Sequence, residues 1–135
     1  MANEFKLTVL TPEKSVLDES VTYLQAPGLE GYFGVLANHA PLIAALMPGK
    51  FTVRKAGGTE EIYALSGGFL EVSDNTAVVL ADALEPRFEI DRARAEAAEK
   101  RARDRLNGSS SEAKIDRARA EAALKRAINR ASISR

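Results

Sequence analysis

The sequence predicts a β + α protein, with an N-terminal antiparallel β-sandwich of about eight to ten strands followed by a C-terminal antiparallel hairpin of two helices. Residues 5–82 consist of short segments of alternating apolar and polar residues, separated by turn residues, which is typical of antiparallel sheets. Residues 90–98 recur, residue for residue, as residues 115–123. Seven of the eight aromatic residues precede position 87. We therefore place the β-domain at residues 1–86 and the helical domain at residues 87–135.

The strands are expected where alternating segments lie between turn signals. Residues 5–10 alternate as a half-buried strand does. Gly57–Gly58 and residues 73–75 (Ser-Asp-Asn) each separate two such segments, and both predict a hairpin. Pro48–Gly49 predicts a further break between strands. The expected strands cover residues 5–10, 15–17, 21–24, 32–36, 50–54, 61–65, 69–72 and 76–80. Short strands in this number, with no helix between them, indicate a sandwich or a flattened barrel.

The two copies of the repeat have the spacing of helices. One apolar stripe is expected on each: Ala95, Ala98, Ala102 and Leu106 on the first; Ala120, Ala123, Leu124, Ala127, Ile128 and Ala131 on the second. Ser111 or one of its neighbours is expected to cap the second helix, with Glu112 in the first turn. Asp91 and Asp116 are likewise expected early in their helices, where the helix dipole favours a negative charge. A seam of alanine methyls, each worth about 0.8 kcal/mol when buried, packs closely but holds weakly. The composition therefore suits a movable arm whose helices persist when separated.

The composition excludes several classes of function. The chain has no cysteine, so disulfides, thiolate catalysis and cysteine-ligated metals are excluded. It has no apolar run of about 18 residues and no hydrophobic signal stretch, so we expect a soluble protein on the cytoplasmic side. Residues 1–86 carry 5 Lys/Arg against 11 Asp/Glu, and residues 87–135 carry 14 against 8. The basic second segment suits acidic or phosphorylated partners.

Two features of the first segment have both a functional and a structural interpretation. His39 is the only histidine; a general base needs a matched partner group, so we favour a turn or interface residue. Residues 66–69 (Ser-Gly-Gly-Phe) resemble a phosphate loop, but they lack the Gly-x-x-x-x-Gly-Lys-Ser/Thr pattern, and no helix follows them. We interpret them as a bulge or a close approach between strands.

The arginines of the helices suggest an anion site. Arg94 and Arg101 are seven residues apart and share a helix face, as do Arg126 and Arg130, four residues apart. In an antiparallel hairpin these pairs can converge on a polyphosphate. The alternative is a solvated surface balanced by nearby acids, namely Glu96, Glu99, Asp104 and Glu121. Nucleic acid is not expected as a partner, because no aromatic residues alternate with the arginines.

Four segments, in this order, resemble the epsilon subunit of bacterial F-type ATP synthases. They are residues 9–12 (Val-Leu-Thr-Pro), residues 31–36 and 39–42, residues 65–72 (Leu-Ser-Gly-Gly-Phe-Leu-Glu-Val) and residues 122–130. The resemblance covers nearly the whole chain. It implies a non-catalytic central-stalk subunit of a proton- or sodium-translocating synthase, peripheral on the cytoplasmic face of the cell membrane, with no metal and no required cofactor.

The resemblance also implies partners. The sandwich of the family binds the gamma subunit and the rotor ring of c subunits, and Gly31, His39 and Pro41 are candidates for these contacts. The helices of the family fold against the sandwich or extend along gamma into the alpha/beta catalytic head. The extended form restrains ATP hydrolysis, and the complex alone associates the subunit with the membrane.

Some bacterial members bind ATP in the folded hairpin through an Ile/Leu-Asp-x-x-Arg-Ala motif. The motif is complete here as Ile90, Asp91, Arg94 and Ala95, and the resemblance extends to Glu85, Arg101, Arg126 and Arg130. Glu85, Ile90 and Asp91 are expected to border the base, and the arginines to meet the phosphates. The second copy, residues 115–120, also satisfies the motif, which we attribute to the helical repeat. ATP is thus expected as a regulatory ligand; the alternatives are a structural stalk subunit that senses no nucleotide and, least supported, an independent enzyme.

Overall fold

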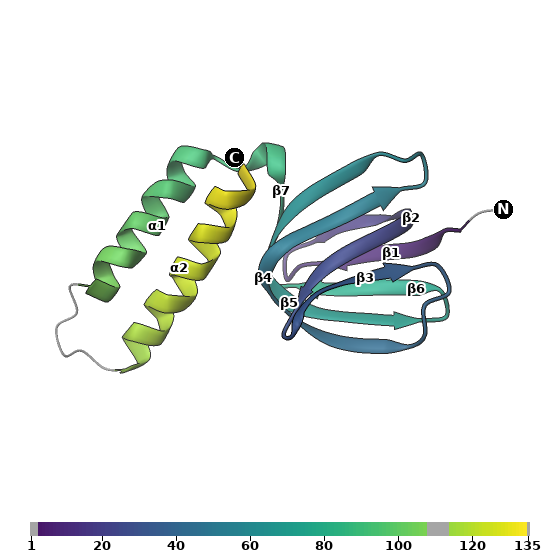
Figure 1. Cartoon of the computed structure of the whole chain (residues 1–135), viewed down its shortest axis with the longest axis horizontal. Coiled ribbons are helices and arrows are strands. Elements are labelled where there is room, and N and C mark those ends of the chain that lie inside the picture. Colours follow the sequence, from purple (N-terminus) through teal and green to yellow (C-terminus); the bar gives the residue numbers. More distant parts are fainter. Residues whose placement is uncertain (1–2, 108–113, 135) are drawn as a thin grey trace. The chain divides into compact units, whose positions relative to one another are not determined.

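The computed structural model describes residues 3–107 and 114–134. The chain forms two compact units, Met1–Pro86 and Arg87–Arg135, and each is described by itself (Figure 1). The first unit contains the strands, and the second contains the helices. Ser111, the expected cap of the second helix, and Glu112, expected in its first turn, lie outside the described residues.

The first unit is a single seven-stranded sheet that closes on itself. Its strands are β1 (Phe5–Leu10), β2 (Ser15–Gly28), β3 (Gly31–Leu36), β4 (Leu42–Lys55), β5 (Glu60–Ser73), β6 (Thr76–Ala81) and β7 (Leu84–Pro86). The path β1-β6-β5-β4-β2 is closed by pairing of β2 with β1, while β3 pairs with β2 and β7 with β5. The expected sandwich or flattened barrel is confirmed. The β1–β6 pair is parallel and all other pairs are antiparallel, so the expectation of a wholly antiparallel sheet was wrong at this pair.

The expected strand count of eight to ten was also wrong, because three strands are long. β2, β4 and β5 have 14 residues each, and each runs through a point where the sequence predicts a break. Pro48 pairs with Ser66 inside the β4–β5 ladder. The β2–β4 ladder shifts register between Gln25 and Gly28, and a proline, which lacks an N–H, is tolerated beside such an irregularity.

Alternating side chains fill the barrel. Phe5, Leu7 and Val9 of β1 are buried, as the alternation predicts. The rest of the core comes from every strand except β7, and its largest fully buried side chains are Phe51, Leu7, Leu24, Leu65 and Leu70. The first unit therefore has a complete core of its own.

The two predicted hairpin turns and the predicted close approach at residues 66–69 are confirmed. Gly58, with a φ of 91°, turns β4 into β5, and Asp74 and Asn75, with φ of 49° and 57°, turn β5 into β6. Both residues of the second turn have positive φ, which matches the twist of the strands they join. At residues 66–69, a Cβ on Gly68 would lie 2.1 Å from the Leu80 carbonyl oxygen. The pair Gly67–Gly68 is thus a close approach of backbones.

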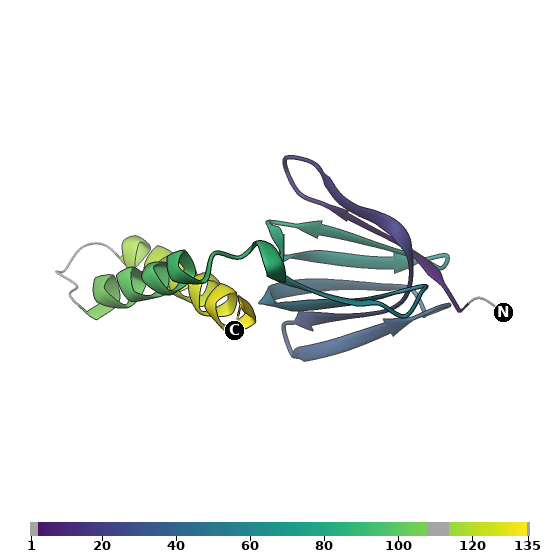
Figure 2. The same ribbon diagram turned by 90° about the horizontal axis from the view of Figure 1, so that it is seen from above.

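The second unit is an antiparallel helical hairpin (Figure 2). A short 3-10 helix, η1 (Arg87–Glu89), precedes α1 (Arg92–Asn107), and α2 (Lys114–Ser134) returns beside α1. The expected alanine stripes are buried at Ala95 and Ala102 on α1, and at Ala120, Ala127 and Ala131 on α2. Ile128 was expected on the α2 stripe but is 36% exposed, because it lies about 100° around the helix from Ala127. No helix in the described part of the chain is long and apolar enough to cross a membrane.

Candidate functional site

The first turn of α1 contains the segment that the sequence analysis singled out. Asp91 immediately precedes the helix, and its Oδ1 accepts a hydrogen bond from the backbone N–H of Arg94 at 3.0 Å. This is the geometry of an N-cap, which satisfies a donor that the helix itself leaves without a partner. The identical second copy behaves differently, because Ile115 and Asp116 already lie within α2. The Ile-Asp pair of the nonapeptide therefore precedes the helix in the first copy and is part of the helix in the second.

Two of the predicted ATP-binding residues pack inside the protein. Ala95 is fully buried, and Ile90 is 8% exposed. The small side chain of Ala95 lets the two helices approach closely. Both residues therefore stabilise the part of the hairpin from which the arginines extend. Glu85 belongs to the first unit, where it is half-buried on β7 opposite Ala64.

The four predicted phosphate-binding arginines project from the same side of the hairpin. On each helix they lie roughly a quarter turn from the buried alanine stripe, in the direction of lower residue numbers. Because α1 and α2 run in opposite directions, the same offset on each helix places the arginines of both helices on one side of the hairpin. The start of α1 and the end of α2 lie at the same end of the hairpin (Figure 1). With a rise of about 1.5 Å per residue, Arg101 and Arg126 each lie about 12–14 Å from that end, and Arg94 and Arg130 within about 6 Å of it.

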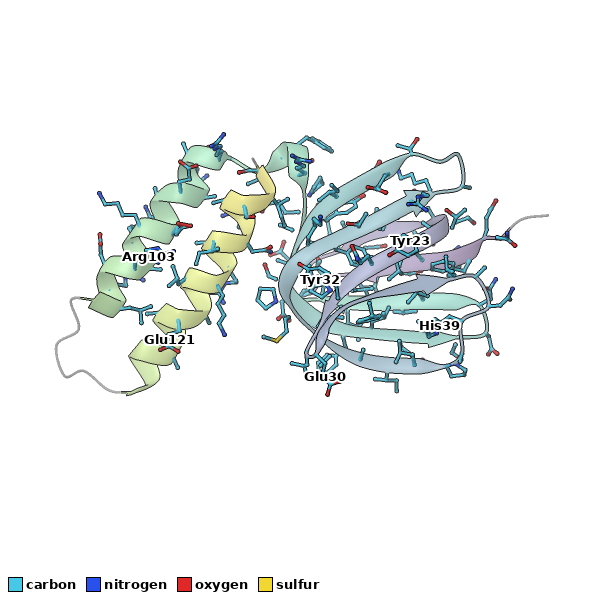
Figure 3. All side chains as sticks on the ribbon, in the orientation of Figure 1. Tyr23, Glu30, Tyr32, His39, Arg103 and Glu121 are labelled. Atoms are coloured by element: carbon cyan, nitrogen blue, oxygen red, sulfur yellow. The ribbon has the colours of Figure 1, made fainter. Side chains whose placement is uncertain are left out.

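Two acidic residues of α1 form ion pairs with other arginines. Glu96 pairs with Arg92 at 3.0 Å, and Glu99 lies 3.9 Å from the Nε of Arg103. Arg103 is nine residues after Arg94 and therefore on the opposite side of α1; Figure 3 labels it. Among the side chains that the structure describes, none forms an ion pair with the arginines Arg94, Arg101 and Arg126. All three are exposed, whereas Arg130 is half-buried.

The three predicted partner-binding residues do not form one site. Gly31 starts β3, while His39 and Pro41 follow its other end, so β3 separates them by about 17 Å. Figure 3 shows Glu30, next to Gly31, and His39 at opposite ends of the sandwich. The sandwich therefore offers two turns for separate contacts.

At the Gly31 end, the neighbouring residue Tyr32 fixes the start of β3 against β4. Gly31 has a φ of 128° and an exposed backbone, a conformation that favours glycine. The hydroxyl of Tyr32 accepts a hydrogen bond from the backbone N–H of Lys50 at 2.9 Å. This bond ties the start of β3 to β4 across Pro27, which pairs with Tyr32 and has no N–H.

At the His39 end, a hydrogen bond orients the imidazole ring. Its Nδ1 lies 2.7 Å from the Ala40 carbonyl oxygen. A carbonyl only accepts, so Nδ1 carries a proton in this contact. The Nε2 atom lies on the side of the ring away from this bond, and Pro41 beside His39 is exposed.

An exposed apolar face of the sheet escaped the sequence analysis. Phe69 pairs with Ala45 and Leu80, and Leu80 pairs with Leu10, so these residues share the outer face of β4, β5, β6 and β1. Phe69 is 58% exposed, Leu80 54% and Leu10 36%; Ile43, 76% exposed, lies two residues before Ala45 on the same face. We call Ile43, Phe69, Leu80 and Leu10 the apolar face. The signal for it is present in the sequence, since apolar residues occupy outward positions that alternation reserves for polar ones.

Comparison with known proteins identifies both units. The family model "ATP synthase, Delta/Epsilon chain, beta-sandwich domain" matches residues 4–87, and "ATP synthase, Delta/Epsilon chain, long alpha-helix domain" matches residues 89–134. The ATP synthase epsilon chain of Pelotomaculum thermopropionicum is 50% identical over 101 residues, 75% of each chain. That of Carboxydothermus hydrogenoformans is 53% identical over 106 residues, 78% of each chain.

Two solved structures resemble the whole chain. A chain in the cryo-EM structure of the Euglena gracilis mitochondrial ATP synthase (OSCP/F1/c-ring) has a TM-score of 0.81 at 29% identity, covering 93% of this chain and 78% of that chain. A chain of the Tetrahymena thermophila mitochondrial ATP synthase central stalk and c-ring has a TM-score of 0.73 at 17% identity, covering 96% of each chain. The second likeness concerns the fold alone.

Proposed function

The chain belongs to the delta/epsilon chain family of ATP synthases, as an epsilon subunit of the central stalk, and from this membership we propose a regulatory role with three parts. The sandwich couples the rotor to the catalytic head. The hairpin restrains ATP hydrolysis by extending toward the head. ATP binds the folded hairpin and stabilises this form. The subunit itself performs no chemistry and acts on the cytoplasmic face of the membrane through the complex.

The surfaces of the sandwich support the coupling role. The apolar face extends over four paired strands, whereas exposed apolar residues on an ordinary surface are scattered singly. We assign it to the gamma subunit, since burial of apolar surface is the main source of stable association. We assign the turns at Gly31 and at His39 and Pro41 to polar contacts with gamma and the rotor ring of c subunits. The Euglena relative belongs to an assembly that contains F1 and a c-ring, which supports these partners.

One observation carries the proposal of ATP binding: on one side of the hairpin, three arginines form no ion pair with any side chain in the described part of the chain. Among the described side chains, Arg94, Arg101 and Arg126 form no ion pair, whereas Arg92 and Arg103 do. Guanidinium groups bind phosphate oxygens through charge-assisted and bidentate hydrogen bonds. Two helices contribute the arginines, so the phosphates bridge α1 and α2. A ligand that bridges both helices binds only while they remain paired.

The alanine seam makes such a ligand effective as a switch. Each buried methyl contributes only about 0.8 kcal/mol, so the folded and extended forms of the arm differ little in free energy. A ligand that binds one form stabilises it by RT ln(1 + [L]/Kd), about 2.7 kcal/mol at a hundredfold excess over Kd. High ATP therefore keeps the hairpin folded, and low ATP releases the arm.

Calorimetric titration of the full chain with ATP tests the proposal. We expect saturable one-to-one binding that weakens about ten- to a hundredfold in Arg126→Ala, because a charge-assisted hydrogen bond is lost. Arg103→Ala is the matched control, since Arg103 lies on the opposite side of α1 and pairs with Glu99. Absence of binding at millimolar ATP would leave a structural stalk subunit without nucleotide sensing. If ATP affinity falls equally in both variants, only the net charge of the hairpin matters, and the proposed site is wrong.

A further inference from the structure

The amide of Asn75 connects three segments at one end of the sandwich. Its Oδ1 accepts a hydrogen bond from the backbone N–H of Asn38 at 2.7 Å. Its Nδ2 donates to the carbonyl oxygen of Glu4 at 2.9 Å. The backbone carbonyl of Asn75 also accepts from the N–H of Lys6 at 3.3 Å. One residue of the β5–β6 turn thus holds the β3–β4 turn and the start of β1.

Asparagine meets two requirements at this position. The φ of 57° places the backbone in the left-handed region, which asparagine tolerates better than most residues. The two side-chain partners are a donor, the Asn38 N–H, and an acceptor, the Glu4 carbonyl. Only a side chain with an acceptor and a donor on the same planar group satisfies both, and this also fixes the orientation of the amide.

The bond to Asn38 acts on the turn that presents His39. Asn38 itself has a φ of 62°, in the same left-handed region that asparagine tolerates, and the hydrogen bond from its N–H to Asn75 Oδ1 ties the turn at this point. His39 follows directly, with its ring held by the bond from Nδ1 to the Ala40 carbonyl. The tether at Asn38 and the bond at Ala40 therefore flank His39 on both sides.

We propose that Asn75 is a positioning residue for partner binding, which holds the turn at Asn38 in the shape that presents His39 and Pro41. The inference rests on the proposed function, because it requires that turn to contact another subunit. Asn75 touches no partner in this account. It lowers the entropy that the turn loses when a partner binds.

The test measures binding of full-length variants to the gamma subunit–rotor ring subassembly of the same synthase. Asn75→Gly keeps the positive φ and removes both side-chain bonds, so we expect roughly three- to tenfold weaker binding and faster exchange of the Asn38 amide. Asn75→Asp keeps an acceptor for the Asn38 N–H, so it should recover most of the affinity lost in Asn75→Gly. Asp74→Gly changes the same turn without touching the tether and should bind as the unmodified chain does.

His39→Ala separates failure of the inference from failure of the proposed function. If His39→Ala weakens binding while Asn75→Gly does not, the turn is a contact that needs no positioning, and the inference is overturned. If His39→Ala leaves binding unchanged, the turn is not a contact, and both its proposed role and the inference fall. If Asn75→Asp binds as weakly as Asn75→Gly, the Asn38 bond is not the cause, and the inference is again overturned.

Discussion

Asp91 Oδ1 accepts a hydrogen bond from the backbone N–H of Arg94 at 3.0 Å, so the acid and the arginine of the predicted nucleotide motif are joined before any ligand arrives. The carboxylate holds the first turn of α1 in place, and with it the backbone from which the Arg94 guanidinium extends. The motif thus has a structural role in addition to any contact with a ligand.

Loss of this cap should loosen the start of α1. We expect Asp91→Ala to destabilise the first turn by about 1 kcal/mol, because the Arg94 N–H loses its acceptor. Amide hydrogen exchange at Arg94 and Ala95 measures the effect. Asp91→Asn is the control, since an asparagine caps equally well; if exchange rises equally in both variants, the negative charge and not the cap is responsible.

Gly68 should tolerate no side chain. Gly68→Ala places a Cβ 2.1 Å from the Leu80 carbonyl oxygen, at a φ of 144°. We expect a loss of about 3 kcal/mol or more in the free energy of unfolding. Urea denaturation followed by tyrosine fluorescence reports on the sandwich alone, because all three tyrosines lie there. Gly57→Ala, with nothing within 4 Å of its Cβ, should change stability by less than about 0.5 kcal/mol.

Glu61 should make the sandwich sensitive to acid. A hydrogen bond from the Tyr63 hydroxyl and another from Lys55 hold the pKa of Glu61 below its usual value. A carboxyl whose folded pKa is lowered contributes stability above its unfolded pKa, and that stability is lost as the pH falls through the folded pKa. Glu61→Gln should flatten the acid side of the stability profile and cost about 1 kcal/mol or less at neutral pH, since the pair is partly exposed. The prediction is contradicted if the stability of Glu61→Gln falls with acid as steeply as that of the unmodified chain. It is also contradicted if Glu60→Gln flattens the profile equally.

The same cluster predicts an alkaline limit. The Glu61 hydrogen bond raises the pKa of Lys55, and burial raises the pKa of Tyr63. Groups with a raised folded pKa stabilise the protein below their unfolded pKa, and this contribution is lost as the pH rises through the folded pKa. We therefore expect stability to fall above about pH 10, the usual range of both groups. A thermal-unfolding midpoint that stays constant from pH 9 to 12 would be inconsistent with the cluster.

Phe69 should matter for assembly more than for folding. It is 58% exposed, so Phe69→Ser should change the stability of the isolated chain by less than about 1 kcal/mol. Loss of an aromatic anchor should weaken binding to the gamma subunit by about tenfold or more. Phe88→Ser is the control, because Phe88 is also highly exposed but lies outside the apolar face. Equal affinity of the Phe69 and Phe88 variants would remove the apolar face from the interface.

The features that depend on local sequence pattern could be predicted from the sequence. Alternation identified the buried residues of β1, and the turn at Asp74–Asn75 and the close approach at Gly68 follow from residues with unusual backbone freedom. The alanine spacing of the helices predicted their seam, because burial on a helix repeats every three to four residues.

Features that depend on pairing between distant segments could not be predicted from the sequence. The run of β4 through Pro48 depends on a register shift in the neighbouring strand, and the parallel pairing of β1 with β6 joins segments about 70 residues apart. The selective pairing of Glu96 and Glu99 with Arg92 and Arg103 depends on side-chain geometry. The two hydrogen bonds of Asn75 join residues 37 and 71 positions away, which no local pattern reveals.

The rate of ATP hydrolysis by the assembled synthase shows whether the hairpin is a regulatory arm. The enzyme is reconstituted either with the full chain or with residues 1–86, which contain the whole sandwich core. We predict that the full chain slows hydrolysis several-fold at low ATP and that the difference disappears as ATP rises, because ATP shifts the arm to its folded form. Equal hydrolysis rates at every ATP concentration would contradict the account and leave a purely structural stalk subunit.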